Sequence, residues 1–454
     1  MKRIVVINIV GLTKKLLGVH TPFLSAWALK NNLTVIHPVL PAVTCSAQAT
    51  FLTGKYPKEH GIVANGWYFK DECEIKFWRQ SNKLVQAKKI WDILKENNPA
   101  FTCANLFWWY NMYSSVDYSV TPRPQYHADG TKLPDIYTSP SALRATLQNK
   151  LGVFPLFDFW GPKTSLRSSQ WIADAARITE ETHSPTLTLV YLPHLDYNLQ
   201  RHGNNFSIIQ KDLIEIDAVC AGLIKFYESR DVEVMILSEY GITDVQNPVH
   251  INRILREHGL ISLREEQGLE LLDAGASAAF AVSDHQIAHV YVNDKNKISA
   301  VRTILEQING IETILDEKGK NLFHLHHERA GDLICVADRN SWFTYYYWWD
   351  DNTAPDFART VDIHRKPGYD PAELILNPNI ALPLFTVGLK LLKKKLGFRY
   401  LMDVIPLDAS LVKGSHGRIP EDTNDFPILV CNEKFEKPID ATEIFSLLMA
   451  KLRK

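Results

Sequence analysis

The sequence predicts a three-layer α/β/α protein, in which helices cover both faces of a largely parallel central sheet and a smaller unit is inserted as a cap. Short apolar runs rich in β-branched residues alternate with longer segments of helical period, which is the pattern of parallel strands joined by helices. The chain has 454 residues, enough for one large domain with an insertion. From about 265 to 330 the alternation continues on a smaller scale, so we expect the cap there.

The strands of the central sheet are expected at the apolar runs. In chain order these runs are about 3–10, 33–39, 101–106, 186–193, 232–238, 332–337 and 427–432, and helices are expected at 81–97, 169–183 and 208–230. Ligands of open α/β sheets bind at the carboxyl ends of the strands. The polar residues at or just beyond these ends are Asn8, Thr44, Asp196, Glu239 and Asp338.

Changes of pattern divide the chain into four segments. Residues 1–264 are expected to form the first part of the core, and 265–330 the inserted cap, with strands at 279–282 and 289–292 and a helix at 298–309. Residues 331–400 are expected to add one core strand and an irregular stretch rich in aromatic residues, which packs the cap on the core or walls a pocket. Residues 401–454 return to the core.

Charge and cysteine content exclude several classes of partner. The 50 basic and 51 acidic residues give a net charge of −1, so no overall electrostatic field attracts a nucleic-acid polymer. We expect a small phosphorylated substrate, on grounds given below.

The six cysteines are scattered singly, unlike those of a secreted disulfide scaffold. The first apolar run is short and is followed by two lysines, which favours a buried strand over a signal peptide. A cytoplasmic location is therefore expected.

Contact with a membrane is a separate question. No apolar stretch is long enough to span a bilayer. Residues 385–399 have apolar and basic faces that could rest on an anionic membrane surface. The short length of the segment favours the alternative, the solvated edge of a packed helix. The oligomeric state is not indicated by the sequence.

The run from Pro41 to Gly54 predicts a hydroxyl group presented at a strand-to-helix turn, with Thr44 at the start of the helix. A helix N-terminus offers free backbone N–H groups and the positive end of a dipole, so it favours an anion and lowers the cost of an alkoxide. An ordinary helix cap is the alternative for a threonine at this position. We interpret Thr44 as the candidate nucleophile.

Several short motifs follow one another along the chain. The Thr44 run continues through Tyr56-Pro57 and His60-Gly61-Ile62 to Asn65, and further on come Asp196, Ser238-Glu239-Tyr240-Gly241 and Gly414-Ser415-His416-Gly417. Together they resemble the nucleotide pyrophosphatase/phosphodiesterase branch of the alkaline phosphatase superfamily, over nearly the whole chain. The resemblance implies an alkaline-phosphatase-like fold in which two metal ions flank a Thr nucleophile and a covalent phospho-enzyme is formed and hydrolysed. It also implies that Asn65 helps to stabilise negative charge on the phosphoryl oxygens.

The resemblance implies metal ligands by position. Asp196 and His416 match ligands of the family, and Glu239 stands in the place of a ligating carboxylate. Thr44 is itself a ligand as well as the nucleophile in this scheme. These four residues are the expected centre of the site.

Other positions depart from the family pattern. Asn8 stands at the end of the first strand, where the family has a ligating Asp, and Tyr240 stands where it has a His. The His expected four residues after Asp196 is Gln200, with His202 two residues further on. We still expect Asn8 to be a ligand.

The replacements change which ion fits. Zinc favours nitrogen and sulfur ligands, whereas oxygens from Asn, Glu, Thr and Tyr suit Mn²⁺ or Mg²⁺. One or two divalent ions are expected, and the choice between zinc and the harder ions stays open. Weaker candidates for replacement ligands are His202, Tyr240, Asp284, His285, His289, Asp362 and His364.

The expected function is metal-dependent hydrolysis of a phosphodiester, a pyrophosphate or a phosphomonoester, with Thr44 as nucleophile. A phosphonate hydrolase or phosphotransferase on the same scaffold is one alternative. A non-catalytic descendant that binds a phosphorylated ligand or nucleotide is another, and the residues at positions 8, 200 and 240 favour it. An interaction module in a biosynthetic assembly is a third.

Overall fold

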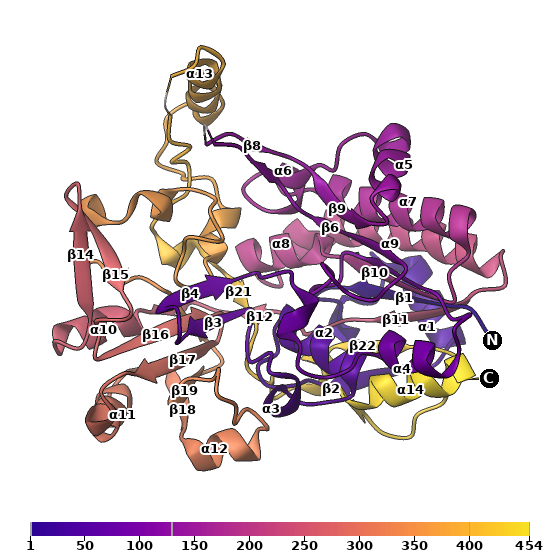
Figure 1. Cartoon of the computed structure of the whole chain (residues 1–454), viewed down its shortest axis with the longest axis horizontal. Coiled ribbons are helices and arrows are strands. Elements are labelled where there is room, and N and C mark those ends of the chain that lie inside the picture. The colour runs from indigo at the N-terminus through magenta and orange to yellow at the C-terminus, as the bar shows by residue number, and fades with distance from the viewer. Residues whose placement is uncertain (1, 129, 399, 454) are drawn as a thin grey trace.

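A nine-stranded, mostly parallel sheet forms the centre of the molecule (Figure 1). The computed structural model describes residues 2–128, 130–398 and 400–453. The strand order is β23 (Ile439–Asp440), β2 (Leu33–His37), β22 (Ile428–Val430), β11 (Glu233–Leu237), β1 (Ile4–Ile9), β10 (Leu187–Leu192), β5 (Cys103–Leu106), β6 (Tyr118–Pro122) and β9 (Ile136–Ser139). Strand β22 runs antiparallel to both of its neighbours, and β9 runs antiparallel to β6.

The first apolar run forms the central strand. Every residue of β1 is buried, and β1 pairs in parallel with β10 and β11. A strand that is covered on both faces is expected to be apolar along its whole length. The one polar residue of β1, Asn8, is opposite Tyr191 on one side and Leu237 on the other, near the carboxyl ends of all three strands.

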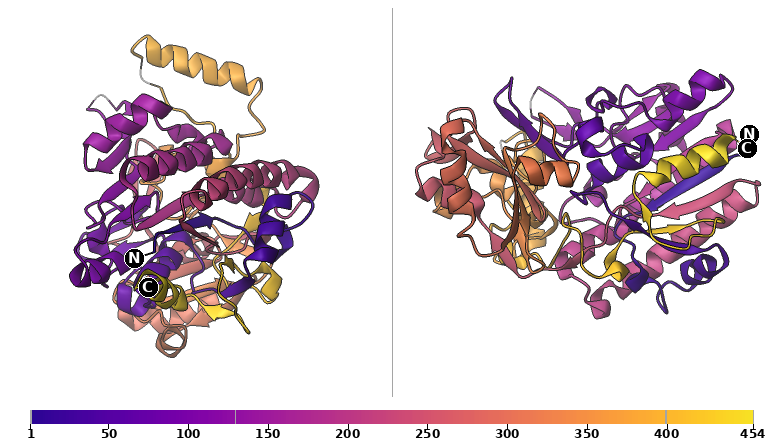
Figure 2. Two further views of the ribbon diagram at one scale, coloured as in Figure 1. Left: turned by 90° about the vertical axis from the view of Figure 1, so that its right-hand side faces the viewer. Right: turned by 90° about the horizontal axis from the view of Figure 1, so that it is seen from below.

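Helices cover both faces of this sheet, which confirms the three-layer prediction (Figures 1 and 2). On one side lie α5 (Ala142–Leu151), α7 (Leu166–His183), α8 (His194–His202) and α9 (Phe206–Glu228), and on the other lie α2 (Thr44–Thr53), α4 (Ile90–Asn97) and α14 (Glu443–Arg453). The remaining helices are α1 (Pro22–Lys30), α3 (Pro57–His60), α6 (Leu156–Phe159), α10 (Ile251–Glu257), α11 (Ile298–Leu305), α12 (Glu317–Leu322) and α13 (Pro383–Lys395). Short 3₁₀ turns are η1 (Lys14–Leu16), η2 (Asn82–Leu84), η3 (Lys295–Lys297), η4 (Asp351–Thr353), η5 (Asp356–Arg359), η6 (Pro371–Leu374), η7 (Ala409–Leu411) and η8 (Thr423–Asp425).

A second sheet of four strands forms the inserted unit. Its order is β16 (Ala279–Asp284), β17 (Ile287–Val292), β19 (Leu333–Ala337) and β18 (Ile311–Leu315). The strand predicted at 332–337 is therefore present, but its assignment to the central sheet is wrong, because it pairs with β17 and β18. A short run of buried apolar residues predicts a strand without indicating which sheet it joins.

Two-stranded pairs connect the two sheets and their loops. They are β3 (Gly66–Phe69) with β4 (Glu74–Phe77), β7 (Gln125–Tyr126) with β8 (Lys132–Leu133), β12 (Thr243–Asp244) with β21 (Gly414–Ser415), β13 (Asn247–Val249) with β20 (Ser341–Phe343), and β14 (Ser262–Glu266) with β15 (Leu269–Asp273). The aromatic run from Trp342 to Trp348 is buried; Phe343 packs in the core of the inserted unit, and the other aromatic residues form an apolar cluster with Val245, Phe357 and Val412. Of the two interpretations of this run, packing is the one that its burial favours.

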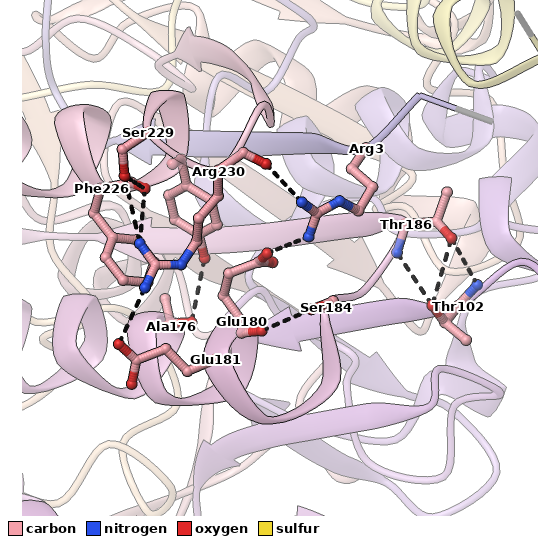
Figure 3. A network of polar contacts seen from close by, with 11 residues as sticks. Arg3, Thr102, Ala176, Glu180, Glu181, Ser184, Thr186, Phe226, Ser229 and Arg230 are labelled. Carbon is pink, nitrogen blue, oxygen red and sulfur yellow. Dashed lines mark hydrogen bonds and ion pairs between the residues drawn. The ribbon is translucent and has the colours of Figure 1, made fainter.

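Ion pairs and hydrogen bonds connect the amino ends of the central strands, the edge opposite the predicted site (Figure 3). Arg3, just before β1, is paired with the buried Glu180 of α7 and donates to the Arg230 carbonyl oxygen over 2.7 Å. Thr102 and Thr186 precede β5 and β10, and each donates its backbone N–H to the other's hydroxyl oxygen, over 3.2 and 3.1 Å. These contacts hold the amino ends of β1, β5 and β10 together, at the edge away from the carboxyl ends where the site is predicted.

Helix α13 stands apart from both sheets, at the tip of an arm that rises from the rest of the molecule (Figures 1 and 2). Within the part of the chain that the structure describes, no helix has the length and hydropathy that a bilayer crossing needs.

Candidate active site

Thr44 is the first residue of α2, and the helix that it begins is buried throughout. The side chain is only 3% exposed. The first backbone N–H groups of a helix have no partner within it, so the positive end of α2 lies at this hydroxyl. The Oγ1 atom is 3.2 Å from the phenol oxygen of Tyr240. The structure thus places Thr44 at the strand-to-helix turn that the sequence predicts.

Asn65 lies directly beside the start of α2. Its side-chain oxygen accepts the backbone N–H of Cys45 over 3.0 Å. Asp284 holds it in place by accepting its backbone N–H over 2.8 Å and its side-chain N–H over 3.1 Å. Burial raises the pKa of Asp284 to about 7, against the lowering effect of these two hydrogen bonds. Asp284, a candidate ligand by sequence, is here an orienting partner of Asn65.

Glu239 lies just beyond the end of β11 and is fully enclosed. Its Oε1 atom accepts hydrogen bonds from the side-chain amides of Asn8 and Gln48. Burial raises its pKa to about 8, while the hydrogen bonds from Gln48 and Asn8 and the nearby Thr44 hydroxyl lower it. Gln48 was not predicted, although it stands four residues after Thr44 and so on the same side of α2.

Asp196 is satisfied by an amide and a phenol. Its Oδ2 atom accepts from Gln200 over 2.7 Å, one turn later on α8, and its Oδ1 atom accepts from the Tyr240 hydroxyl over 3.2 Å. Because that hydroxyl donates its proton to Asp196, it accepts from Thr44. Burial raises the pKa of Asp196 to about 7, although both hydrogen bonds lower it. A continuous path of hydrogen bonds therefore leads from Thr44 to Asp196.

Four rings stack beside this path. Tyr240 and His416 are parallel with centroids 3.6 Å apart, and His285 lies 3.7 Å from His416 on one side and 3.7 Å from Tyr369 on the other. The Tyr369 hydroxyl donates to Gln200 over 3.0 Å. The stack and the hydrogen bonds thus form a closed loop that passes through Asp196. Tyr369 belongs to this loop and was not predicted as a site residue from the sequence.

His285 reaches the stack from the tip of the hairpin between β16 and β17. Its φ of 62° is left-handed, which is uncommon for a residue with a side chain and is concentrated at functional sites. His416 donates from Nδ1 to the Ala42 carbonyl oxygen over 2.8 Å, and its Nε2 atom has no partner among the described residues. Burial lowers the pKa of His416 to about 3, so its ring is neutral.

Unpartnered atoms show where a divalent ion fits. In the described part of the chain, Oδ1 of Asn8 and Oε2 of Glu239 are buried acceptors without a donor, and Thr44 lies close enough to Glu239 to lower its pKa. A set of amide, carboxylate and hydroxyl oxygens suits Mg²⁺ or Mn²⁺. This position fits one ion.

The position beside Asp196 and His416, where the resemblance implies another metal ion, does not fit an ion in the same way. Both oxygens of Asp196 already accept hydrogen bonds, and Gln200 points its amide N–H at that carboxylate. The Nε2 atom of His416 is the acceptor left over there among the residues described. Hydrogen-bond donors thus take one acceptor position on each oxygen of Asp196.

The other candidate ligands have different surroundings. His202 is exposed at the end of α8. His364 lies 3.4 Å from the Phe77 carbonyl oxygen, and the Asp362 backbone N–H donates to Glu373. His289 lies 3.2 Å from the Val63 carbonyl oxygen and accepts the Gly331 N–H. None of these contacts brings the four residues to Thr44.

A separate acidic group could also hold a metal ion. His194, Asp212 and Glu215 are, among the described residues, the one group of this kind with ligand atoms within 4.8 Å of one another. His194 Nε2 is 3.3 Å from Asp212 and 3.2 Å from Glu215, beside a cavity of about 400 Å³. The sequence signal that could have revealed it is a histidine before Asp196, followed on the next helix by two acids three residues apart.

Comparison with known proteins places the chain in a family. The family model for type I phosphodiesterase / nucleotide pyrophosphatase matches residues 4–370. Ectonucleotide pyrophosphatase/phosphodiesterase 2 of Saccharomyces cerevisiae is 26% identical over 269 residues, which are 53% of this chain and 48% of that protein. The match thus spans about half the length of this curated relative.

Solved structures share the fold at low identity. Murine ectonucleotide pyrophosphatase/phosphodiesterase 5 is 15% identical with a TM-score of 0.57, covering 100% of this chain and 95% of that one; an inactive Thr-to-Ala variant of it was solved with AMP. Phosphonoacetate hydrolase of Sinorhizobium meliloti, solved with phosphonoacetate, is 13% identical with a TM-score of 0.62 and coverage of 99% and 96%. The fold is therefore alkaline-phosphatase-like. Since the family model spans most of the chain, the protein belongs to the type I phosphodiesterase/nucleotide pyrophosphatase family of hydrolases.

Proposed function

We propose that this protein cleaves a phosphodiester, pyrophosphate or phosphomonoester bond of a small phosphorylated molecule, with Thr44 as the nucleophile. The observation that carries the proposal is the hydrogen-bonded path from the Thr44 hydroxyl through Tyr240 to the Asp196 carboxylate. It begins at the positive end of a buried helix, where an anion is favoured. A general base works best when its pKa is near the working pH, and that of Asp196 is about 7.

In the first step, Thr44 Oγ1 forms a bond to phosphorus while the bond to the leaving oxygen breaks. The Thr44 proton passes to the Tyr240 oxygen as the Tyr240 proton passes to Asp196, and the leaving oxygen takes a proton from water. In the second step, water attacks phosphorus and gives one proton to the hydroxide left from the first step, the bond to Thr44 breaks, and the proton held by Asp196 returns to the Thr44 oxygen along the same path. Asn65, positioned by Asp284, donates to the phosphoryl oxygens.

One divalent ion fits this scheme. Asn8, Glu239 and Thr44 would hold it through oxygen atoms. When bound, it would supply positive charge that neutralises the phosphoryl oxygens.

Replacing the nucleophile tests the proposal. Thr44→Ala should lower turnover of bis-p-nitrophenyl phosphate or p-nitrophenyl phosphate about a thousandfold or more, since the nucleophile is lost. Thr44→Ser is the matched control, because it keeps a hydroxyl group at the same place, and it should retain measurable turnover. Equal melting temperatures would show that both variants fold. Full turnover by Thr44→Ala would overturn the nucleophile assignment.

A non-catalytic protein that binds a phosphorylated ligand is the second candidate. It is favoured by the hydrogen bonds that Gln200 and Tyr240 make to Asp196, where the resemblance implies a second metal ion. AMP is a suitable first ligand, because it was solved bound to murine ectonucleotide pyrophosphatase/phosphodiesterase 5. Binding of AMP without turnover under any added Mg²⁺, Mn²⁺ or Zn²⁺ would support this candidate. Cleavage of phosphonoacetate would instead indicate a phosphonate hydrolase.

We further propose a cytoplasmic location. All six cysteines are free thiols, and five of them are buried, which suits a reducing compartment. Fractionation of the producing cells checks this, since recovery outside the cytoplasm and its membrane surface would contradict it.

A further inference from the structure

Helix α13 carries an exposed apolar stripe. Phe385, Leu389, Leu392 and Leu396 are 63%, 45%, 50% and 63% exposed. Steps of four, three and four residues place them on one side of the helix, and the backbone N–H of Leu396 continues the helical hydrogen bonding to Leu392. A soluble helix normally turns such a stripe towards a core, whereas here the helix projects from the body (Figures 1 and 2).

The same helix is attached to the body by another side. Val387 packs against a small apolar cluster that includes Ala372, Val404 and Ile405. Lys390 pairs with Asp403 and donates to the Leu401 carbonyl oxygen over 2.9 Å. The attachment therefore fixes the arm and leaves the stripe uncovered. The expectation of a packed helix with a solvated edge does not describe this arrangement.

Basic residues border the stripe. Lys393 and Lys395 are exposed and stand on opposite sides of it by helical spacing. Residues 385–399 contain five basic residues and no acidic one, while the whole chain has a net charge of −1. Lysines beside an apolar stripe extend their charged ends to the lipid headgroups while the stripe enters the acyl boundary. The remainder of the chain has 45 basic and 51 acidic residues, so the arm is net positive on a net acidic protein.

We propose that α13 binds the surface of an anionic lipid bilayer, with Phe385, Leu389, Leu392 and Leu396 buried among the acyl chains. The helix lies on the membrane and does not cross it, in agreement with the hydropathy of the described helices. A second copy of the chain is a poorer occupant, because two arms with the same positive charge would repel each other. The anionic inner leaflet of a cell membrane has the matching charge. This inference is independent of the chemistry proposed for Thr44.

Vesicle flotation tests the inference with the full-length chain. The wild type should float with phosphatidylcholine vesicles that contain phosphatidylserine, and more weakly with phosphatidylcholine alone. Leu389→Glu combined with Leu392→Glu should lower the partition coefficient about tenfold or more, because two charges enter the apolar face. Lys393→Gln combined with Lys395→Gln should weaken binding only to the anionic vesicles.

A matched control is available elsewhere on the surface. Leu322 of α12 is 74% exposed and lies away from the arm, so Leu322→Glu makes the same chemical change and should leave flotation unchanged. Melting temperatures equal to that of the wild type would show that the arm variants fold. The proposal is overturned if the wild type floats with neither vesicle or if the glutamate variant floats as the wild type does. It is also overturned if the arm mutations abolish a dimer of a protein that does not bind vesicles.

Discussion

Two single residues, Gln200 and Tyr240, determine the hydrogen bonds around Asp196. Gln200 and Tyr240 stand at two positions where the resemblance implies histidine, and each donates a hydrogen bond to Asp196. An imidazole would offer a nitrogen lone pair, whereas an amide N–H or a phenol O–H offers a proton. The buried carboxylate keeps its partners through this exchange and avoids the cost of an unpaired buried charge. We therefore expect no second ion beside Asp196 in the wild-type protein.

Restoring both imidazoles should restore the second ion. We expect Gln200→His combined with Tyr240→His to bind one additional divalent ion, with a preference for zinc, because the imidazole at position 200 would join Asp196 and His416 and the phenol would no longer donate to Asp196. Elemental analysis after dialysis gives the stoichiometry. Gln200→His combined with Tyr240→Phe is the control, since it removes the phenol hydroxyl without adding the second imidazole. An unchanged metal content in the double histidine variant would contradict this account of the site.

At the scale of elements, the start of β1 depends on one ion pair (Figure 3). Glu180 of α7 is 1% exposed and its second oxygen has no partner in the described part of the chain. Burial raises its pKa, and Arg3 is the principal group that lowers it. Removing one member of such a pair leaves an uncompensated buried charge, which is more costly than the loss of the contact itself.

We therefore expect Arg3→Ala to lower the free energy of unfolding by about 1–3 kcal/mol, a value reduced because Arg3 is partly exposed. Denaturant unfolding measures it. Arg167→Ala is the control, because Arg167 lies on α7 like Glu180, and its 3.7 Å pair with Asp158 is far more exposed to solvent. This substitution should change the free energy of unfolding by less than about 1 kcal/mol. Equal losses of unfolding free energy in the two variants would show that the buried Arg3–Glu180 pair contributes no more to stability than the exposed pair.

The elements also show what sequence could predict. Six strands of the central sheet, the helix that starts at Thr44, and the approach of Asn8, Asp196 and Glu239 to one sheet edge follow from local apolar pattern and strand order, whereas β6, β9 and β23 were not predicted and His416 was assigned only through the family resemblance. Strand β19 was assigned to the wrong sheet, because burial is alike in both. Tyr369 and the orienting role of Asp284 depend on segments that meet only in the folded chain, so no local pattern indicates them.

For the whole molecule, ion binding should appear as added stability. A ligand that binds only the folded state stabilises it by about 2.7 kcal/mol at a hundred times its Kd, so we expect Mn²⁺ or Mg²⁺ to raise the Tm and EDTA to reverse the effect. Differential scanning fluorimetry measures the change. Glu239→Gln should remove most of it, because the ion loses its one carboxylate ligand.

The acidic group on α8 and α9 provides the control for that measurement. His194→Ala removes the imidazole between Asp212 and Glu215 and should leave the Tm increase intact. If His194→Ala removes the increase and Glu239→Gln does not, the ion binds in that group, and the site at Thr44 works without it.

The stack of four rings has a kinetic consequence. Tyr240 and His416 belong to the core, His285 to the tip of a hairpin in the inserted sheet, and Tyr369 to the segment that leads to the arm. With Thr44 only 3% exposed, we expect a ligand to reach the hydroxyl only after these parts separate. Opening then precedes binding, so the observed association rate should level off as the ligand concentration rises, and the apparent affinity falls by the fraction of molecules that are open. A contact that links the inserted sheet or the arm to another surface could change that fraction without touching the ligand.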